Sequence, residues 1–173
     1  MPDVKGIRSE NEISDNPNLR VDYSPELQLS ISCSEVEGHT AGIECRCDVT
    51  CRVLHPGGHF EYVSGGLLFD IEGSESFASF LEELRQVQRG EASCAVLKNV
   101  GEEFVLTLET ADRILRRVHM NVAAREYVAD IQDFATAQFH VELDYDLYVN
   151  KLLEAVVAFV RDLRRFAGSV GRI

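Results

Sequence analysis

The stretch Ile43–Val53, IECRCDVTCRV, decides the fold. Along it, apolar residues and cysteines alternate with charged and polar residues. Successive side chains of a β-strand point to opposite faces, so this rhythm predicts a strand with one buried and one wet face. Such a two-faced strand is typical of an antiparallel sheet.

The same alternation continues on both sides of this strand. Leu27–Cys33 repeats it upstream. Downstream, residues 55–59 (HPGGH) supply proline and glycine for a turn, and alternation resumes over residues 60–62 and 67–71. We expect the intervening Gly65-Gly66 pair to form a bulge or a sharp bend.

Two segments have helical periodicity instead. Apolar residues recur every three or four positions from Phe77 to Val87, with Ser74 or Ser76 as the N-cap and Gly90 as the stop. A second, broader apolar stripe predicts a helix over 146–166, for which Asp146 is a suitable capping residue. Both helices are amphipathic, so each is expected to pack on the sheet.

Four more alternating segments lie between the helices, at residues 93–97, 104–109, 114–122 and 138–145. The resulting order is β-β-β-α-β-β-β-β-α. Connections of hairpin length dominate, and the alternation of strands and helices that marks a parallel sheet is missing. The sequence therefore predicts the α+β class, with a mainly antiparallel sheet of about seven strands and two helices packed on it.

Composition narrows the class of protein further. Residues 1–24 are polar and without periodicity, so we expect a loosely ordered arm followed by one domain over 25–173. No apolar run is long enough to span a membrane, and the N-terminus lacks the apolar region of a signal peptide, which predicts a cytoplasmic protein. The net charge of −12 argues against nucleic acid and anionic membranes as partners, and permits a basic protein partner.

The cysteines raise the question of a metal site. Their C-x-C and C-x3-C spacings follow the strand period, whereas structural zinc sites favour C-x2-C in turns. We interpret them as buried thiols that act as small hydrophobic residues, and we expect no metal and no cofactor. A metal or redox role is the alternative, including a partial site formed by two histidines across the turn. The residues concerned are Cys33, His39, Cys45, Cys47, Cys51, His55 and His59, with Cys94 apart.

Two charged groups are candidates for chemistry. Glu142, Asp144 and Asp146 lie at the expected start of the second helix, where the helix dipole stabilises acidic side chains, so we expect a structural role for them. A basic group, Arg113, Arg116, Arg117 and His119, is expected to pair with neighbouring acids across strands. No nucleophile elbow, phosphate loop, dinucleotide fingerprint or metalloprotease motif is present, so we expect a protein that is not an enzyme.

Three stretches carry a family likeness: GLLFDIEGSESFASFLEEL (66–84), FVLTLET (104–110) and FHVELDYDLYVNKLLEAVVAFV (139–160). With them, residues 27–166 resemble WapI-like immunity proteins and related uncharacterised bacterial domains. The resemblance implies a protein that neutralises a cognate toxin by binding it, and it implies no catalytic residues.

The leading hypothesis is therefore a non-enzymatic protein-binding domain, an immunity protein in its more specific form. Its partner would meet an acidic face. One alternative is a small-molecule-binding protein or enzyme with a pocket on a concave sheet, lined by Phe60, Tyr62 and Phe69. Another is the subunit of a structural homo-oligomer such as a homodimer. The expected acidic face comprises Glu44, Asp48, Glu103, Glu109, Glu142 and Asp144.

Overall fold

The computed structural model describes residues 16–24, 27–39, 42–55 and 58–170. The elements in chain order are β1 (Asn18–Ser24), β2 (Leu27–His39), β3 (Gly42–His55), β4 (Gly58–Asp70), α1 (Phe77–Gln88), β5 (Cys94–Lys98), β6 (Phe104–Asp112), β7 (Arg117–Val128), β8 (Asp133–Asp144) and α2 (Tyr145–Val170).

The strands form two antiparallel sheets of four strands each. The first sheet has the order β1-β2-β3-β4, and the second has the order β5-β6-β7-β8. Every neighbouring pair is antiparallel. The predicted α+β class with mainly antiparallel strands and two helices is confirmed. The strands form two separate sheets, which the alternation alone did not indicate.

The additional strand is β1, which lies inside the segment 1–24 expected to be a loose arm. Asn18–Ser24 pairs with β2, and Leu19 and Val21 are buried while Arg20 and Asp22 are exposed. The expectation was wrong for these residues because only two apolar positions carry the alternation, and polar neighbours hide it. Residues 1–15 lie outside the described part of the chain.

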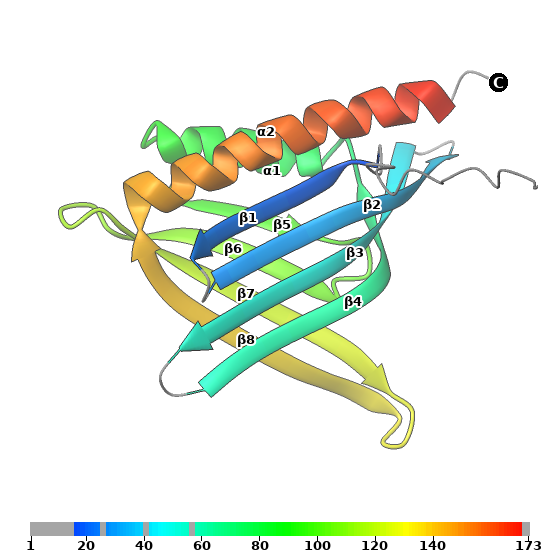
Figure 1. The fold of residues 1–173 in the computed structure, drawn as a ribbon, viewed down its shortest axis with the longest axis horizontal. Helices are drawn as coiled ribbons and strands as arrows, with labels where there is room; N and C mark the ends of the chain where they lie inside the picture. Colours follow the sequence, from blue (N-terminus) through cyan, green and yellow to red (C-terminus); the bar gives the residue numbers. More distant parts are fainter. Residues whose placement is uncertain (1–15, 25–26, 40–41, 56–57, 171–173) are drawn as a thin grey trace, which may run out of the picture.

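The two sheets pack against each other through their apolar faces. Figure 1 shows the first sheet in front of the second, with both helices along the side where β1 and β5 lie. Phe77 of α1 links the layers, because its ring stacks on Phe69 of β4 at 4.8 Å and meets Phe159 of α2 edge-on at 4.9 Å. One continuous core thus joins sheets and helices. Neither described helix has the length and apolarity that a membrane crossing needs.

The start of α1 is fixed by a reciprocal pair of serines. The hydroxyl of Ser76 accepts a hydrogen bond from the amide of Ser79 at 3.1 Å, and the hydroxyl of Ser79 accepts one from the amide of Ser76 at 2.8 Å. This capping box satisfies two amide groups at the helix start that have no partner within the helix. Of the two predicted caps, Ser76 is the one used, and Gly90 follows the helix with a positive φ of 74°.

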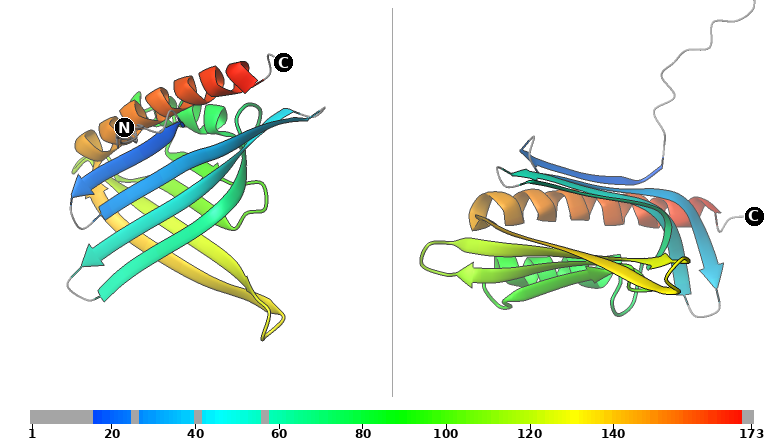
Figure 2. Two further views of the ribbon diagram at one scale, coloured as in Figure 1. Left: turned by 45° about the vertical axis from the view of Figure 1, so that its right-hand side comes forward. Right: turned by 90° about the horizontal axis from the view of Figure 1, so that it is seen from below.

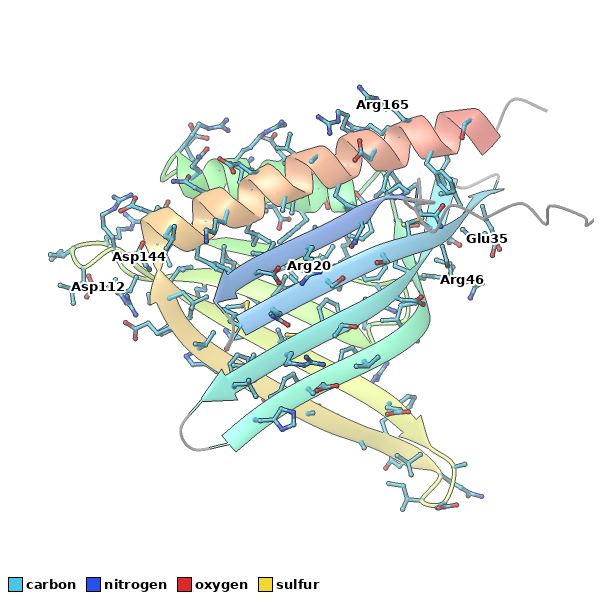
Figure 3. The ribbon with its side chains drawn as sticks, in the orientation of Figure 1. Arg20, Glu35, Arg46, Asp112, Asp144 and Arg165 are labelled. Carbon is cyan, nitrogen blue, oxygen red and sulfur yellow. The ribbon has the colours of Figure 1, made fainter. Side chains whose placement is uncertain are left out.

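The start of β7 and the cap of α2 differ from the positions expected from the sequence. β7 starts at Arg117 rather than at residue 114, because the Asp112 carboxylate accepts hydrogen bonds from the amides of Ile114 and Leu115 and folds residues 112–115 into a turn. The Ile114 side chain is 92% exposed. The cap of α2 is Asp144, which accepts from the amide of Leu147 at 2.9 Å, and not Asp146. Figure 3 shows Asp112 and Asp144 at the same end of the molecule.

Two bulges flank β3 where the first sheet bends. The register with β2 shifts between Cys33 and Glu35, and the register with β4 shifts opposite Gly65-Gly66. The predicted irregularity at the glycine pair is therefore confirmed. Gly66 has a φ of 73°, and its amide donates to Asp48 at 3.0 Å. Figure 2, right, shows strands of the first sheet curving toward the second sheet at one end.

Candidate functional site

Each sheet has one edge near a helix and one edge away from both helices. α2 packs on β1, and α1 packs on β5. On the opposite side of the molecule, β4 and β8 are the outer strands of their sheets, and no described helix covers them (Figures 1 and 2). An edge strand presents backbone donors and acceptors that another chain can pair with. These two strands are therefore candidates for a binding surface.

A shallow depression of about 220 Å³ lies between these strands, and we call this region the open edge. Glu61 and Tyr62 of β4 form one wall. β7 and β8 form the other. Two carboxylates, Glu61 and Glu126, thus face a strip of small side chains. The full lining comprises Glu61, Tyr62, Ala124, Glu126, Ala135, Thr136 and Ala137.

Aromatic rings close the gap beneath the open edge. Phe60 of β4 stacks on Phe139 of β8 with centroids 5.5 Å apart, and Tyr62 stacks on Phe104 at 5.8 Å. Burial raises the pKa of the Tyr62 phenol, and the Glu103 and Glu126 carboxylates raise it further. Tyr62 is therefore an uncharged hydroxyl next to negative charge. The Glu61 carboxyl has a lowered pKa because His59 and Arg52 contact it.

The distal half of β8 stands away from the core. All side chains of residues 133–138 are exposed, whereas Leu143 near the other end of the strand is buried. In the described part of the chain β8 pairs with β7 alone. The Arg125 guanidinium covers the Phe134 ring at 4.4 Å and donates to the carbonyl of Gly101 at 3.0 Å, which ties the projecting hairpin to the sheet. Ile131 near its tip is 63% exposed.

The six acids predicted to form one face are spread over two sheets. Glu44 and Asp48 lie on the outward side of β3, in the first sheet. Glu109 of β6 and Glu142 of β8 share a row with His119 on the outward side of the second sheet. The apolar faces of the two sheets meet, so these outward faces point in opposite directions. The six residues do not form one continuous surface.

Most of these six acids are also engaged within the fold. Asp48 accepts from the amide of Gly66, and Asp144 caps α2. Glu103 accepts from the side-chain amide of Asn99. Glu142 accepts from Arg117 at 2.9 Å, and Arg117 and His119 lower the pKa of its carboxyl.

The basic group at the start of β7 pairs with acids, as expected. The Arg116 guanidinium forms a bidentate pair with Asp146 and lowers the pKa of that carboxyl. Arg117 and His119 contact Glu142. Arg113, also in this predicted group, lines a depression of about 170 Å³ beside Tyr145.

The four cysteines of β2 and β3 are buried, as the alternation indicated. Three of their sulfurs gather in one place: those of Cys33, Cys45 and Cys47 lie within 4.8 Å of one another. Cys47 donates to the Cys45 sulfur at 3.6 Å. We call these three residues the thiol cluster. Cys51 lies on the same face of β3 outside the cluster, and burial raises the pKa of its thiol to about 12.

The three thiols of the cluster titrate as a unit. Hydrogen bonds from Cys45 and Cys47 lower the pKa of the Cys33 thiol, because they stabilise its thiolate. The pKa values of Cys45 and Cys47 are raised, since hydrogen bonding to Cys33 and burial oppose a second negative charge. One proton thus leaves the cluster more readily than the next.

The remaining candidates form no further site among the residues that the structure describes. The side chains of His39 and His55 lie outside the described residues, so the two-histidine arrangement with His59 stays a prediction. Phe69 is fully buried against Phe77 and does not line a pocket with Phe60 and Tyr62. A shared strand face predicts which residues are buried together. It does not indicate which of them meet a cavity.

The geometry defines an α+β protein with two facing antiparallel sheets and one uncovered side. Comparisons with protein-family models, with curated proteins and with solved structures give no match to this chain. The open edge and the thiol cluster are therefore the two features of the structure that bear on function. Sequence reasoning included Cys33, Cys45 and Cys47 only within a broader alternative metal group, and it did not indicate the open edge, because both features depend on which strands become neighbours.

Proposed function

We propose that the protein is a non-enzymatic protein-binding domain and that its partner docks a basic, extended segment along the open edge. The observation that carries this proposal is the outer strand β8, whose residues 133–138 have exposed side chains beside the acidic depression. A long exposed edge strand invites pairing with another chain, and natural proteins usually bend, charge or cover such an edge.

Addition of a partner strand to β8 would use two features of the open edge: the outer position of β8 and the acidic depression beside it. Backbone hydrogen bonds from β8 would hold an extended segment, and this supplies affinity with little dependence on sequence. Side chains of that segment would alternate between solvent and the depression. Glu126 lies at the depression, and Glu61 adds negative charge there although Arg52 and His59 contact it, so lysine or arginine is the residue type that fits.

The charge of the whole chain supports a basic partner. A net charge of −12 attracts a cationic protein at long range and speeds encounter at low salt. The resemblance to WapI-like immunity proteins makes the proposal more specific: the partner is a toxin, such as a basic nuclease, and binding neutralises it. Acids on the outward faces contribute to steering, and the open edge provides the contact.

The test uses as partners the proteins encoded beside the gene of this protein, among which we expect a basic toxin. Binding is measured by calorimetry at low and at physiological salt, with Glu126→Lys as the interface variant and Glu109→Lys as the matched control. Both substitutions reverse an exposed glutamate in the second sheet, but Glu109 lies away from the open edge. We expect Glu126→Lys to weaken binding about tenfold or more, and Glu109→Lys to change it by less than about threefold.

Three results would contradict the proposal. The first is no binding to the neighbouring toxin at low ionic strength. The second is an equal loss of affinity in Glu126→Lys and Glu109→Lys, because the partner would then respond to the net charge of the protein and not to the open edge. The third is a wild-type dimer in light scattering that Glu126→Lys dissociates, since a second copy would then occupy β8.

A further inference from the structure

The thiol cluster sits on the inner side of the bend in the first sheet. Cys33 of β2 lies directly opposite Cys47 of β3, and Cys45 follows two residues before Cys47 on the same face. Both neighbouring strands change register next to Cys47. Figure 3 shows Glu35 and Arg46, which border the first of these bulges, at the curved end of the sheet. Bulges aim side chains in directions that a regular ladder does not allow.

The spacing of the three sulfurs matches a small ion. Metal–sulfur bonds are about 2.3 Å long, so three sulfurs in a plane around one ion lie about 4 Å apart. The observed separations are all within 4.8 Å, and the Cys45–Cys47 pair is at 3.6 Å. Closing the triangle around an ion therefore needs shifts of less than about 1 Å per pair.

The donor set selects the kind of ion. Among the described residues the group consists of three thiols, without a carboxylate or histidine. Thiolate sulfur is a soft ligand that suits Cu(I) and Zn(II), but closed zinc sites are four-coordinate. Cu(I) is stable with three sulfur ligands in a plane.

We propose that Cys33, Cys45 and Cys47 bind one Cu(I) ion in a trigonal site. Each sulfur that ligates as a thiolate releases its proton to solvent, and no electron is transferred. The bound ion takes the place of thiol protons that the cysteines would keep if they were only apolar filler in the core. This site is independent of the open edge, so binding of Cu(I) and binding of a protein partner are tested separately.

A surface depression adjoins the thiol cluster at the first bulge. A depression of about 240 Å³ reaches Cys33 next to the outward-facing Ser32 and Ser34. Beyond the bulge, the Arg46 guanidinium and the Glu35 carboxylate lie 3.9 Å apart. A local opening of the strand here exposes Cys33 without unfolding the sheet, and exposed strand bulges are among the less protected parts of a fold.

The experiment titrates reduced full-length protein with Cu(I) under anaerobic conditions, in competition with a chromogenic Cu(I) chelator. The variants are Cys33→Ala, Cys45→Ala and Cys47→Ala, and Cys51→Ala is the matched control because it removes a buried thiol from the same face of β3. We expect one Cu(I) per wild-type chain. Loss of even an outer-shell partner costs about 10- to 100-fold in affinity, so loss of a ligand should weaken binding at least that much.

A second measurement needs no variant. Thiols of the wild-type protein are alkylated with and without Cu(I) and identified by mass spectrometry after mild denaturant pulses. Protection of Cys33, Cys45 and Cys47, with unchanged labelling of Cys51 and Cys94, supports the site. The proposal is overturned by equal binding in wild type and cluster variants, by equal loss in Cys51→Ala, or by a preference for Zn(II) over Cu(I) in the same titration.

Discussion

The substitution Phe77→Ala tests whether the first sheet and the two helices share one core. Phe77 is the first residue of α1 and is fully buried. Its ring stacks on Phe69 of β4 and meets Phe159 of α2 edge-on. Removing it therefore affects the first sheet and both helices at once.

The magnitude follows from burial and from the two ring contacts. Truncation of a buried phenylalanine to alanine costs about 3–5 kcal/mol, and each aromatic pair contributes about 0.5–1.5 kcal/mol of its own. Phe77 makes two such pairs, so we expect the upper part of the range, about 4–5 kcal/mol. Natural domains have free energies of unfolding of about 5–15 kcal/mol, so the variant should retain only a small margin.

Urea denaturation followed by circular dichroism measures this loss, and Phe134→Ala is the control. Phe134 is 45% exposed on the projecting hairpin and contacts the Arg125 guanidinium. Its removal should cost less than about 1 kcal/mol. A similar cost for both variants would refute the shared core. So would two separate transitions in Phe77→Ala, because they would show that the first sheet and the helices unfold independently.

Two further predictions concern single polar groups. Ser76→Ala removes the acceptor of the Ser79 amide, and we expect a loss of about 1–2 kcal/mol in thermal unfolding, against no comparable loss in the exposed Ser74→Ala. Asp70→Asn should stabilise the protein near neutral pH, because burial and the Glu44 carboxylate raise the pKa of the Asp70 carboxyl. A raised folded-state pKa means that stability falls as pH rises, so the gain should vanish below the ordinary value of 3.8, and a gain independent of pH would count against this cause.

The sequence predicted individual strands better than their assembly. Alternation in Ile43–Val53 correctly indicated the buried side chains from Cys45 to Val53 but not at Ile43, which is 41% exposed. Helical spacing placed α1 to within a residue. Alternation cannot tell whether a buried face meets a helix or a second sheet, so the split into two sheets was missed. β1 was not predicted because Leu19 and Val21 alone carry its alternating pattern. Its strand conformation depends on pairing with β2.

The same limit applies to the sites. A backbone rise of about 3.3 Å per residue separates Cys45 from Cys47, yet their sulfurs meet because side chains on one face can turn toward each other. The third thiol, Cys33, comes from a neighbouring strand whose register is set by a bulge. The predicted acidic face failed to form one surface because faces of different sheets look alike in sequence.

The two halves of the chain have the same topology, and this topology explains why no helix covers β4 and β8. Each half is a four-stranded meander followed by a helix, so each helix leaves from an outer strand, β4 or β8. α2 crosses back to cover β1 of the first half, and α1 covers β5 of the second. Because both helices lie along the first strands of the meanders, the last strands remain uncovered.

The two uncovered strands are not equivalent as docking edges. β4 is interrupted at Gly65-Gly66, where the Asp48 carboxylate accepts from the Gly66 amide and the Arg46 guanidinium donates to the Gly66 carbonyl. A bulge whose backbone groups already have partners cannot extend a regular ladder, so it protects the edge on which it lies. No register shift interrupts the pairing of β8 with β7 from residue 133 to residue 144. We therefore expect the proposed partner strand to pair with β8, and we expect the bulge at Gly65-Gly66 to keep β4 from competing for it.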